Sequence, residues 1–277
     1  MNATREAWFL GPTSHIWAVT MATTRAYLKR YSAYLIQLIR WPLGPLIMFV
    51  TYRVTYGASG RTHVGGATIS GFLLIGMVGL VTWTSTVWAS GYALEFERYE
   101  GTSGALFLSP ASRAAVVAGY GLGSFLWFLP SFAVLVLLGV VTGARLHVAD
   151  PLALGLAALS LVVSSLAVGF TFAGLFILSR RGNMIANFVQ QPIYLLAGFL
   201  VPLDSLPHWV RPISNALPVT HAVAALRQSA LAGATLRQAG PQIGLALVTA
   251  AAYWVVGLIA LRRVEHVAKR AGQLDLY

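Results

Sequence analysis

The sequence predicts an all-α, polytopic membrane protein with six transmembrane helices. The 277 residues are 57% hydrophobic and only 10% charged, whereas a soluble domain carries about 25% charged residues. The mean hydropathy is +0.71. Six apolar segments approach the ~20 residues that a helix needs to cross a bilayer. The predicted spans are residues 34–56, 68–91, 114–141, 151–178, 183–201 and 242–261.

An amphipathic helix is predicted over residues 15–33, ahead of the first span. Its apolar stripe recurs at three- and four-residue steps: Trp17, Met21, Thr24, Leu28 and Tyr31. The basic residues of this segment lie mostly away from the stripe. The pattern is typical of an interfacial helix with basic groups toward the lipid headgroups. The alternative is an ordinary cytoplasmic extension of the first span.

The spans contain prolines and hydroxyl groups that need an explanation. Pro42 and Pro45 lie in the first span, and Pro192 lies in the fifth, which is the shortest. Ser and Thr residues of the second and fourth spans have no acidic or His residue in register, so we interpret them as helix-packing groups. Five tryptophans fall mostly near the predicted membrane–water interfaces, where Trp typically anchors a helix among the lipid headgroups (a belt anchor). They are Trp41, Trp83, Trp88, Trp127 and Trp209.

The distribution of basic residues predicts the orientation. Thirteen of the 19 Lys and Arg residues lie in segments on the side of the N-terminus. The positive-inside rule therefore predicts that both termini are cytoplasmic, in a multi-pass protein of the plasma membrane. The net charge of +11 then indicates contact with anionic lipids, and we expect no nucleic acid partner.

Several kinds of chemistry are excluded or disfavoured. The chain has no cysteine, which excludes disulfides and thiol catalysis. It has no Gly-x-x-x-x-Gly-Lys-Ser/Thr segment, which is the usual phosphate cradle. Its six histidines are scattered without metal-ligand spacing. We therefore expect no catalytic residue, no metal and no cofactor in this chain.

The segment 95–113, between the second and third spans, is the most informative part of the sequence. It begins with three Glu and one Arg within six residues. Gly101 interrupts the helix, Thr102 can cap a new one, and Pro110 ends it. A short helix with acidic flanks and apolar side chains can occupy a groove in a soluble partner. The alternative is a solvated loop.

The pattern Glu97-Arg98-x-x-Gly101-Thr102-x-x-x-Leu106-x-x-Ser109-Pro110 resembles the signature of the ABC-2 type permeases. These are six-span membrane subunits of ATP-driven exporters, and the short loops favour the drug-resistance (daunorubicin-type) branch. The first span is similar as well, with Pro45-Leu-Ile and Tyr56-Gly57. Further similarities follow in the family's order: Pro192, Gly198, Pro202, Leu206-Pro207, Trp209, Pro218-Val-Thr220 and Arg227.

The resemblance implies a coupling helix that docks on a nucleotide-binding subunit. Its residues would be Glu97, Arg98, Gly101, Thr102, Leu106, Leu108, Ser109 and Pro110. It also implies two ABC ATPase subunits per complex, which hold ATP and Mg²⁺, and a second permease chain, identical or homologous. Residues 203–240 would form short re-entrant helices at the outer mouth. Their gate candidates are Pro207, Trp209, Pro218 and Arg227.

The chain departs from the family pattern at two places. Gly104 stands where many members have an acidic residue, and Tyr99-Glu100 replaces a more basic pair. These differences indicate partner contacts that are particular to a dedicated ATPase.

Polar residues in the spans suggest a path for the substrate. Gln190 and Gln191 lie in the middle of the fifth span beside Phe188 and Tyr194, and polar groups at that depth need protein or a wet cavity around them. Hydrogen bonding between helices is the alternative.

Arg53 lies about 20 Å along the helix from Arg40, so one of the two is predicted at the hydrocarbon edge. There it would either snorkel or bind an anionic substrate group.

The predicted function is therefore ATP-driven export of an amphipathic drug, antibiotic or lipid. A polysaccharide or glycoconjugate exporter of the same family is an alternative. An ion-driven secondary transporter would show inverted repeats and intramembrane carboxylates, which are not evident here. A membrane scaffold without transport is the third alternative.

Overall fold

The computed structural model describes residues 12–33, 36–60, 62–102, 104, 106, 109, 111–178 and 182–271. These residues are almost entirely helical, apart from a short antiparallel pairing of β1 (His63–Val64) with β2 (Ala67–Thr68). A 3₁₀ turn, η2 (Leu203–Ser205), follows α9. The helices are α2 (Pro12–Ser32), α3 (Ile36–Ala58), α4 (Ile69–Tyr99), α6 (Arg113–Trp127), α7 (Leu129–Val141), α8 (Pro151–Leu178), α9 (Gly182–Leu196), α10 (Arg211–Ala216), α11 (Pro218–Leu231) and α12 (Leu236–Ala271).

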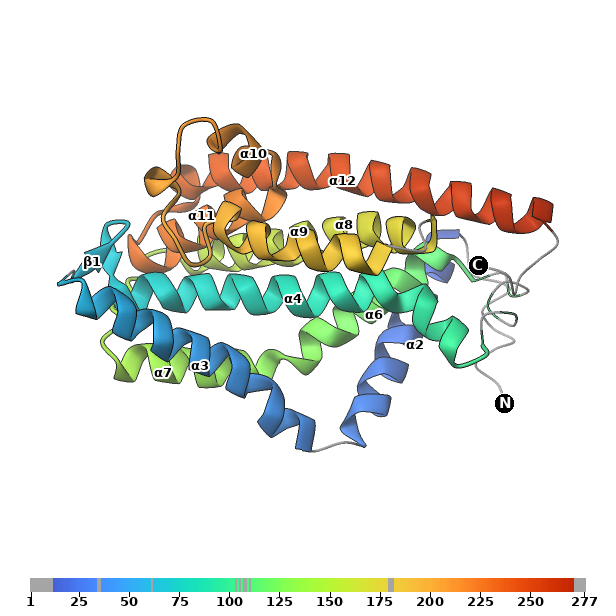
Figure 1. The fold of residues 1–277 in the computed structure, drawn as a ribbon, viewed down its shortest axis with the longest axis horizontal. Coiled ribbons are helices and arrows are strands. Elements are labelled where there is room, and N and C mark those ends of the chain that lie inside the picture. The colour runs from blue at the N-terminus through green and yellow to red at the C-terminus, as the bar shows by residue number, and fades with distance from the viewer. Residues whose placement is uncertain are drawn as a thin grey trace.

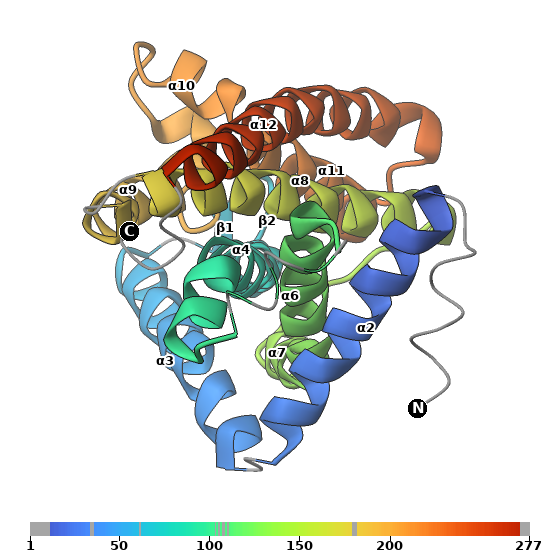
Figure 2. The same ribbon diagram turned by 90° about the vertical axis from the view of Figure 1, so that its right-hand side faces the viewer.

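Helix α4 is the centre of the bundle. It packs against α3, α6, α7, α8 and α11, and most of its residues between Ser70 and Leu94 are buried. Figure 2 shows α2 and α3 as two sides of a triangular outline, with α8 along the third side and α4, α6 and α7 inside. Helix α12 covers the outer surface of α8. A helix that is apolar on every side is stable only at such a position, or in a bilayer.

The structure has a helix over each of the six ranges predicted as spans. Within the described residues, four helical stretches are long and apolar enough to cross a membrane: Ile69–Tyr99, Arg113–Val141, Pro151–Gly174 and Leu236–Arg263. Helices α3 and α9 are not among them. With 15 residues, α9 extends about 22 Å, which is less than the ~30 Å hydrocarbon core. The count of six spans therefore stays a prediction.

The third predicted span is not one continuous helix. It consists of α6 and α7, which meet at Phe128 and diverge beyond it (Figure 1). Pro130 lies in the first turn of α7, and its ring nitrogen has no hydrogen to donate to the carbonyl of the preceding turn. The missing bond explains the break between α6 and α7.

Helix α2 packs closely on α6 through two glycines four residues apart. A Cβ atom on Gly119 would lie 2.5 Å from the Cβ of Thr23, and one on Gly123 would lie 2.8 Å from the Cβ of Tyr27. The Thr24 hydroxyl also donates a hydrogen bond to the Gly119 carbonyl over 3.2 Å. Small residues at this spacing let two helix backbones approach. Of the stripe predicted for the interfacial helix, Thr24 faces α6, while Trp17 is 64% exposed; the position of α2 at a membrane interface stays a prediction.

The two ends of the molecule differ. Helices α10 and α11 and the β1–β2 pair gather at one end, and α4 ends at the opposite one (Figure 1). At the first end, the Asp150 carboxylate accepts hydrogen bonds from the amides of Leu152 and Ala153 in α8, at 3.0 and 3.2 Å. It also accepts one from the amide of Leu236 in α12 over 2.9 Å. Asp150 thus caps two helices, and these bonds lower the pKa of its carboxyl.

Candidate functional site

The end of α4 has a defined turn. The Gly101 amide donates to the Arg98 carbonyl over 3.1 Å, and the Thr102 amide donates to the Glu97 carbonyl over 2.9 Å. These two bonds form a Schellman motif. Gly101 has a φ of +71°, which glycine adopts at no steric cost. The predicted helix interruption at Gly101 is confirmed, and the turn sets the direction in which the next segment leaves α4.

Glu97 joins three segments at this turn. One carboxylate oxygen accepts a hydrogen bond from the Tyr120 hydroxyl of α6 over 2.6 Å. The other accepts one from the Thr102 hydroxyl. Downstream, the Leu106 amide donates to the Thr102 carbonyl over 3.0 Å. Thr102 is therefore hydrogen-bonded to the end of α4, and Glu97 connects that end to α6.

Glu100 connects the same turn to α2. Its carboxylate forms an ion pair with Arg30 at 2.5 Å, and the Arg30 guanidinium lies 4.7 Å from the centre of the Phe96 ring. Both charged side chains are more than a third exposed, so the pair adds at most about 1 kcal/mol of stability. Glu100 is one of the departures from the family pattern, and here it has a partner within the chain.

The structure places six of the eight predicted coupling residues. The turn is formed by Glu97, Arg98, Gly101 and Thr102, and Arg98 is exposed. Leu106 is half-buried against a cluster that includes Tyr27, Val116 and Tyr120. The Ser109 hydroxyl donates to the Leu106 carbonyl over 2.9 Å. Leu108 and Pro110 lie outside the described residues.

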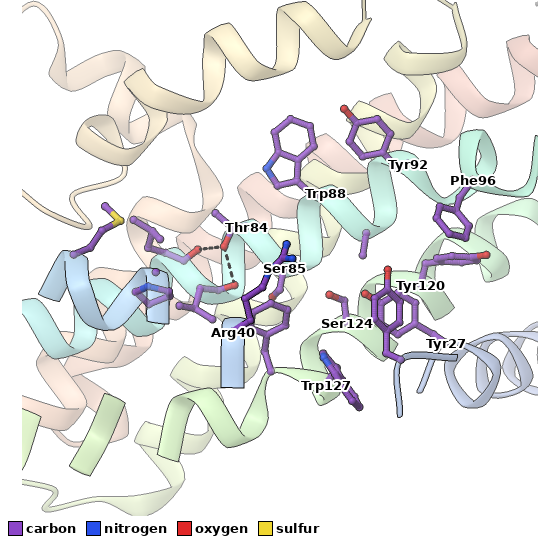
Figure 3. A pocket seen from close by; sticks show the side chains of 18 of the residues that line it. Tyr27, Arg40, Thr84, Ser85, Trp88, Tyr92, Phe96, Tyr120, Ser124 and Trp127 are labelled. Carbon is purple, nitrogen blue, oxygen red and sulfur yellow. Dashed lines mark hydrogen bonds between the residues drawn. The ribbon is translucent and has the colours of Figure 1, made fainter. Parts of the chain in front are cut away.

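A cavity of about 620 Å³ lies between α2, α3, α4 and α6, with Tyr194 of α9 at its edge. Nine of its lining residues are aromatic, and Arg40 of α3 is the one charged residue among those that the structure describes there. The aromatic residues are Tyr27, Tyr31, Trp88, Tyr92, Phe96, Tyr120, Trp127, Phe128 and Tyr194. In the view of Figure 3, Trp88 and Tyr92 lie on one side and Tyr27, Tyr120 and Trp127 on the other, with Arg40 between them.

Contacts between the rings hold the cavity wall in place. Trp88 and Tyr92 are stacked, with ring centroids 5.3 Å apart and planes 14° apart. Tyr27 and Tyr31 are stacked at 4.4 Å, and Tyr27 meets Tyr120 edge-on at 5.8 Å. Such pairs stabilise each other beyond the area that they bury. Contacts within this one chain therefore organise the wall.

Only two of the predicted substrate-path residues, Gln190 and Tyr194, are brought together. Tyr194 reaches the cavity, and Gln190 donates its amide to the Tyr194 hydroxyl. Phe188 and Gln191 lie on the exposed face of α9. Arg53 lies elsewhere and donates to the Ser70 hydroxyl over 3.0 Å and to the Thr142 carbonyl over 3.1 Å. Its observed role is to join α3 to the start of α4 and the end of α7.

The interpretation of the tryptophans as anchors at the membrane interface is wrong for Trp83, and two of the other tryptophans contribute to the cavity. Trp83 is 1% exposed in the protein core, and Trp88 and Trp127 line the cavity. One signal in the sequence could have located the wall. Trp88, Tyr92 and Phe96 recur every four residues, which places them on one face of a helix.

The predicted outer-gate residues fall into two groups. A guanidinium nitrogen of Arg227 donates to the carbonyls of Gly198 and Phe199 at 2.6 and 3.2 Å, and the group lies 4.0 Å from the centre of the Phe72 ring. Buried Pro218 begins α11. These two residues hold α11 in the bundle. Pro207 accepts a bond from the Val210 amide, and Trp209 is 75% exposed on the surface.

Several known proteins are similar to this chain in sequence. The Daunorubicin resistance ABC transporter permease protein DrrB1 of Streptomyces coeruleorubidus is 27% identical over 220 residues, which are 78% of this chain and 73% of that protein. The Probable doxorubicin resistance ABC transporter permease protein DrrC of Mycobacterium tuberculosis is 26% identical over 247 residues, covering 84% of this chain and 83% of the relative. ABC transporter G family member 20 of Dictyostelium discoideum is 26% identical over 68% of this chain and 25% of its own length.

The family assignment rests on a match to most of the chain. The family model for the ABC-2 type transporter matches residues 14–231. That range begins in α2 and ends with α11, so it includes the α4 turn and all of the cavity wall. The chain belongs to the ABC-2 type transporter family.

Proposed function

We propose that this chain is the membrane-spanning permease subunit of an ATP-driven exporter that moves an amphipathic substrate outward. ATP would be hydrolysed, with Mg²⁺, in a separate ABC ATPase subunit. The observation that carries the proposal is the junction at the end of α4. There a fixed turn at Gly101 presents the following segment, while Glu97 and Glu100 connect it to α6 and α2.

The same junction supports a mechanism of coupling. A motion of the docked ATPase would displace the segment after Gly101, and the Glu97–Tyr120 and Glu100–Arg30 contacts would pass the displacement to α6 and α2. Helices α2, α4 and α6 are also walls of the aromatic cavity. ATP binding could then change the shape of the cavity, provided that the ATPase binds the two shapes with different affinity.

The proposed complex contains two ATPase subunits and a second permease chain, identical or homologous. The exposed face of α9 supports the second chain. Met184 and Phe188 on that face are 63% and 79% exposed, and polar Gln191 is exposed beside them. A polar side chain at membrane depth needs a protein partner or a wet cavity. Gln191 would find either one between two permease chains.

The two ends of the molecule support the proposed orientation. Both termini would be cytoplasmic, in the plasma membrane, with six spans and with α2 at the inner interface. The α4 turn would then face the compartment that contains ATP, and α10 and α11, which lie at the opposite end (Figure 1), would form the outer mouth. The remaining exposed apolar side chains would contact membrane lipids.

A glycoconjugate exporter of the same family is the second candidate, because aromatic walls also suit sugar rings. The volume of the cavity favours a compact amphiphile, since about 620 Å³ lies within the range of ~300–1,000 Å³ that is usual for drug-sized ligands.

Inside-out membrane vesicles provide the test. We expect vesicles with this chain and its ATPase to accumulate a fluorescent amphiphile only with ATP and Mg²⁺. Leu106→Asp should abolish the accumulation while the protein still inserts in the membrane. Accumulation that needs no ATP and stops when a proton or sodium gradient is collapsed would contradict the proposal and indicate a secondary transporter.

A further inference from the structure

The aromatic cavity indicates the chemical class of its ligand. We propose that it binds the transported molecule, an amphiphile with one acidic group and an aromatic ring system, and that Arg40 pairs with the acidic group. The identity of the ligand as the transported molecule rests on the function proposed above. The site itself does not, because it is built from the contacts of a single chain.

The charge of the cavity selects an anion. Arg40 is exposed and reaches the cavity from the second turn of α3. None of the described lining residues is acidic, so the cavity offers a cationic ligand no counter-charge. Ser85 and Ser124 also line it. The Ser85 hydroxyl donates to the Thr82 carbonyl over 3.2 Å, and it would rotate away from that carbonyl to donate to a carboxylate, sulfonate or phosphate.

The walls of the cavity select an aromatic body. Trp88 with Tyr92, and Tyr27 with Tyr120, present ring faces and edges from α4, α2 and α6. Offset and edge-on contacts of this kind favour a flat ring system. A flexible acyl chain would gain no such directional contact. A planar acid of drug size therefore fits this cavity better than a bilayer phospholipid.

The position of Arg40 suggests where the ligand enters. In the predicted topology, the start of α3 and the end of α4 lie at the cytoplasmic surface. Figure 3 shows Arg40 beside Ser85, well before Phe96 along α4. Arg40 would therefore be near the inner edge of the membrane, and Met48 and Leu80 would line the deeper part. An amphiphile from the inner leaflet could then keep its acidic group near the headgroups while its rings enter the protein.

Photolabelling of the purified full-length chain in lipid nanodiscs tests this proposal. The probes are (trifluoromethyl-diazirinyl)benzoic acid and its methyl ester, which differ in the negative charge and by one methyl group. Mass spectrometry locates the labelled residues and gives the probe concentration for half-maximal labelling. We expect the acid to label residues of the cavity wall, such as Trp88 and Tyr92. Arg40→Gln should raise the half-maximal concentration for the acid about tenfold or more and leave that for the ester unchanged.

Three controls keep the result specific. Arg25→Gln removes an exposed charge from α2 outside the cavity, and it should leave labelling by the acid unchanged. Arg40→Lys keeps the charge but loses the planar guanidinium, so its labelling by the acid should weaken less than that of Arg40→Gln. This variant also provides the test if Arg40→Gln proves unstable. Trp88→Ala should weaken labelling by the acid and by the ester alike.

Three results would overturn the proposal. The first is equal labelling of the wild type and Arg40→Gln by the acid. The second is labelling confined to lipid-facing residues such as Ile47 and Val54, which are 64% and 62% exposed. The third is loss of cavity labelling when anionic phosphatidylglycerol replaces part of the zwitterionic lipid, which would identify a bilayer lipid as the occupant. Labelling needs neither ATP nor the ATPase, so the cavity can bind the acid even if vesicle transport fails. Equally, vesicles can show ATP-driven transport even if the acid does not label the cavity.

Discussion

Replacement of Gly101 by Ala should uncouple transport from ATP hydrolysis without unfolding the chain. Gly101 has a φ of +71°, and its amide and that of Thr102 close the turn at the end of α4. A Cβ atom at this position would have nothing within 4 Å. The substitution therefore adds no clash, and its only effect is on the backbone conformation.

The size of the effect follows from the left-handed backbone. An L-residue in this conformation costs about 1–2 kcal/mol, and the reduced entropy of the unfolded chain returns about 0.4–1 kcal/mol. A net cost of about 1 kcal/mol reduces the population of the native turn about fivefold relative to alternative turns. Gly101→Asn should retain most of the function, because Asn tolerates this conformation.

The assay is the number of substrate molecules exported per ATP hydrolysed, in proteoliposomes that contain the chain and its ATPase. Gly104→Ala is the matched control. Its Cβ would also meet nothing within 4 Å, and Gly104 lies in helical backbone, where Ala is favourable. A wild-type ratio in Gly101→Ala, or an equal loss in Gly104→Ala, would refute the role of the turn.

Three further predictions concern the helices around the turn. Gly119→Leu should separate α2 from α6 and cost about 1–3 kcal/mol, seen as a lower Tm of the solubilised chain; an unchanged Tm would disprove this contact. Reversing either charge of Arg30 and Glu100 should lower export per ATP, and reversing both should restore it, whereas additive losses would argue against the pair. Backbone amides lower the pKa of Asp150 in the folded chain, so its stabilisation is present above its unfolded pKa of about 3.9 and is lost as pH falls through the lower folded value. The thermal stability of Asp150→Asn should accordingly fall less in acid than that of the wild type, and identical acid profiles would contradict the capping role.

Local patterns predicted much of the fold. Hydropathy located all six helical ranges, because a helix that is apolar over a long stretch has few other stable environments. The Gly101-Thr102 pair predicted the end of α4, because left-handed backbone favours glycine. Pro130 could have predicted the break between α6 and α7 in the same way. These features depend on residues that are near one another in the sequence.

The cavity could not be predicted in this way. Its walls come from α2, α3, α4 and α6, and only the packing of these helices brings Tyr27 close to Tyr120. No local pattern favoured Arg40 over Arg53, since the two arginines lie in the same apolar helix. Trp83 was misassigned for the same reason, because its position along α4 does not show that neighbouring helices bury it.

The measurement that tests the central claim most directly is co-purification from the native membrane in mild detergent, with an assay of ATPase activity. The account predicts that an ABC ATPase accompanies the wild-type chain and is lost with Leu106→Asp. Size-exclusion profiles that match the wild type would show that this variant is folded. Recovery of the chain without an ATPase in every detergent tested would contradict the account and remove the assigned role of the turn at Gly101.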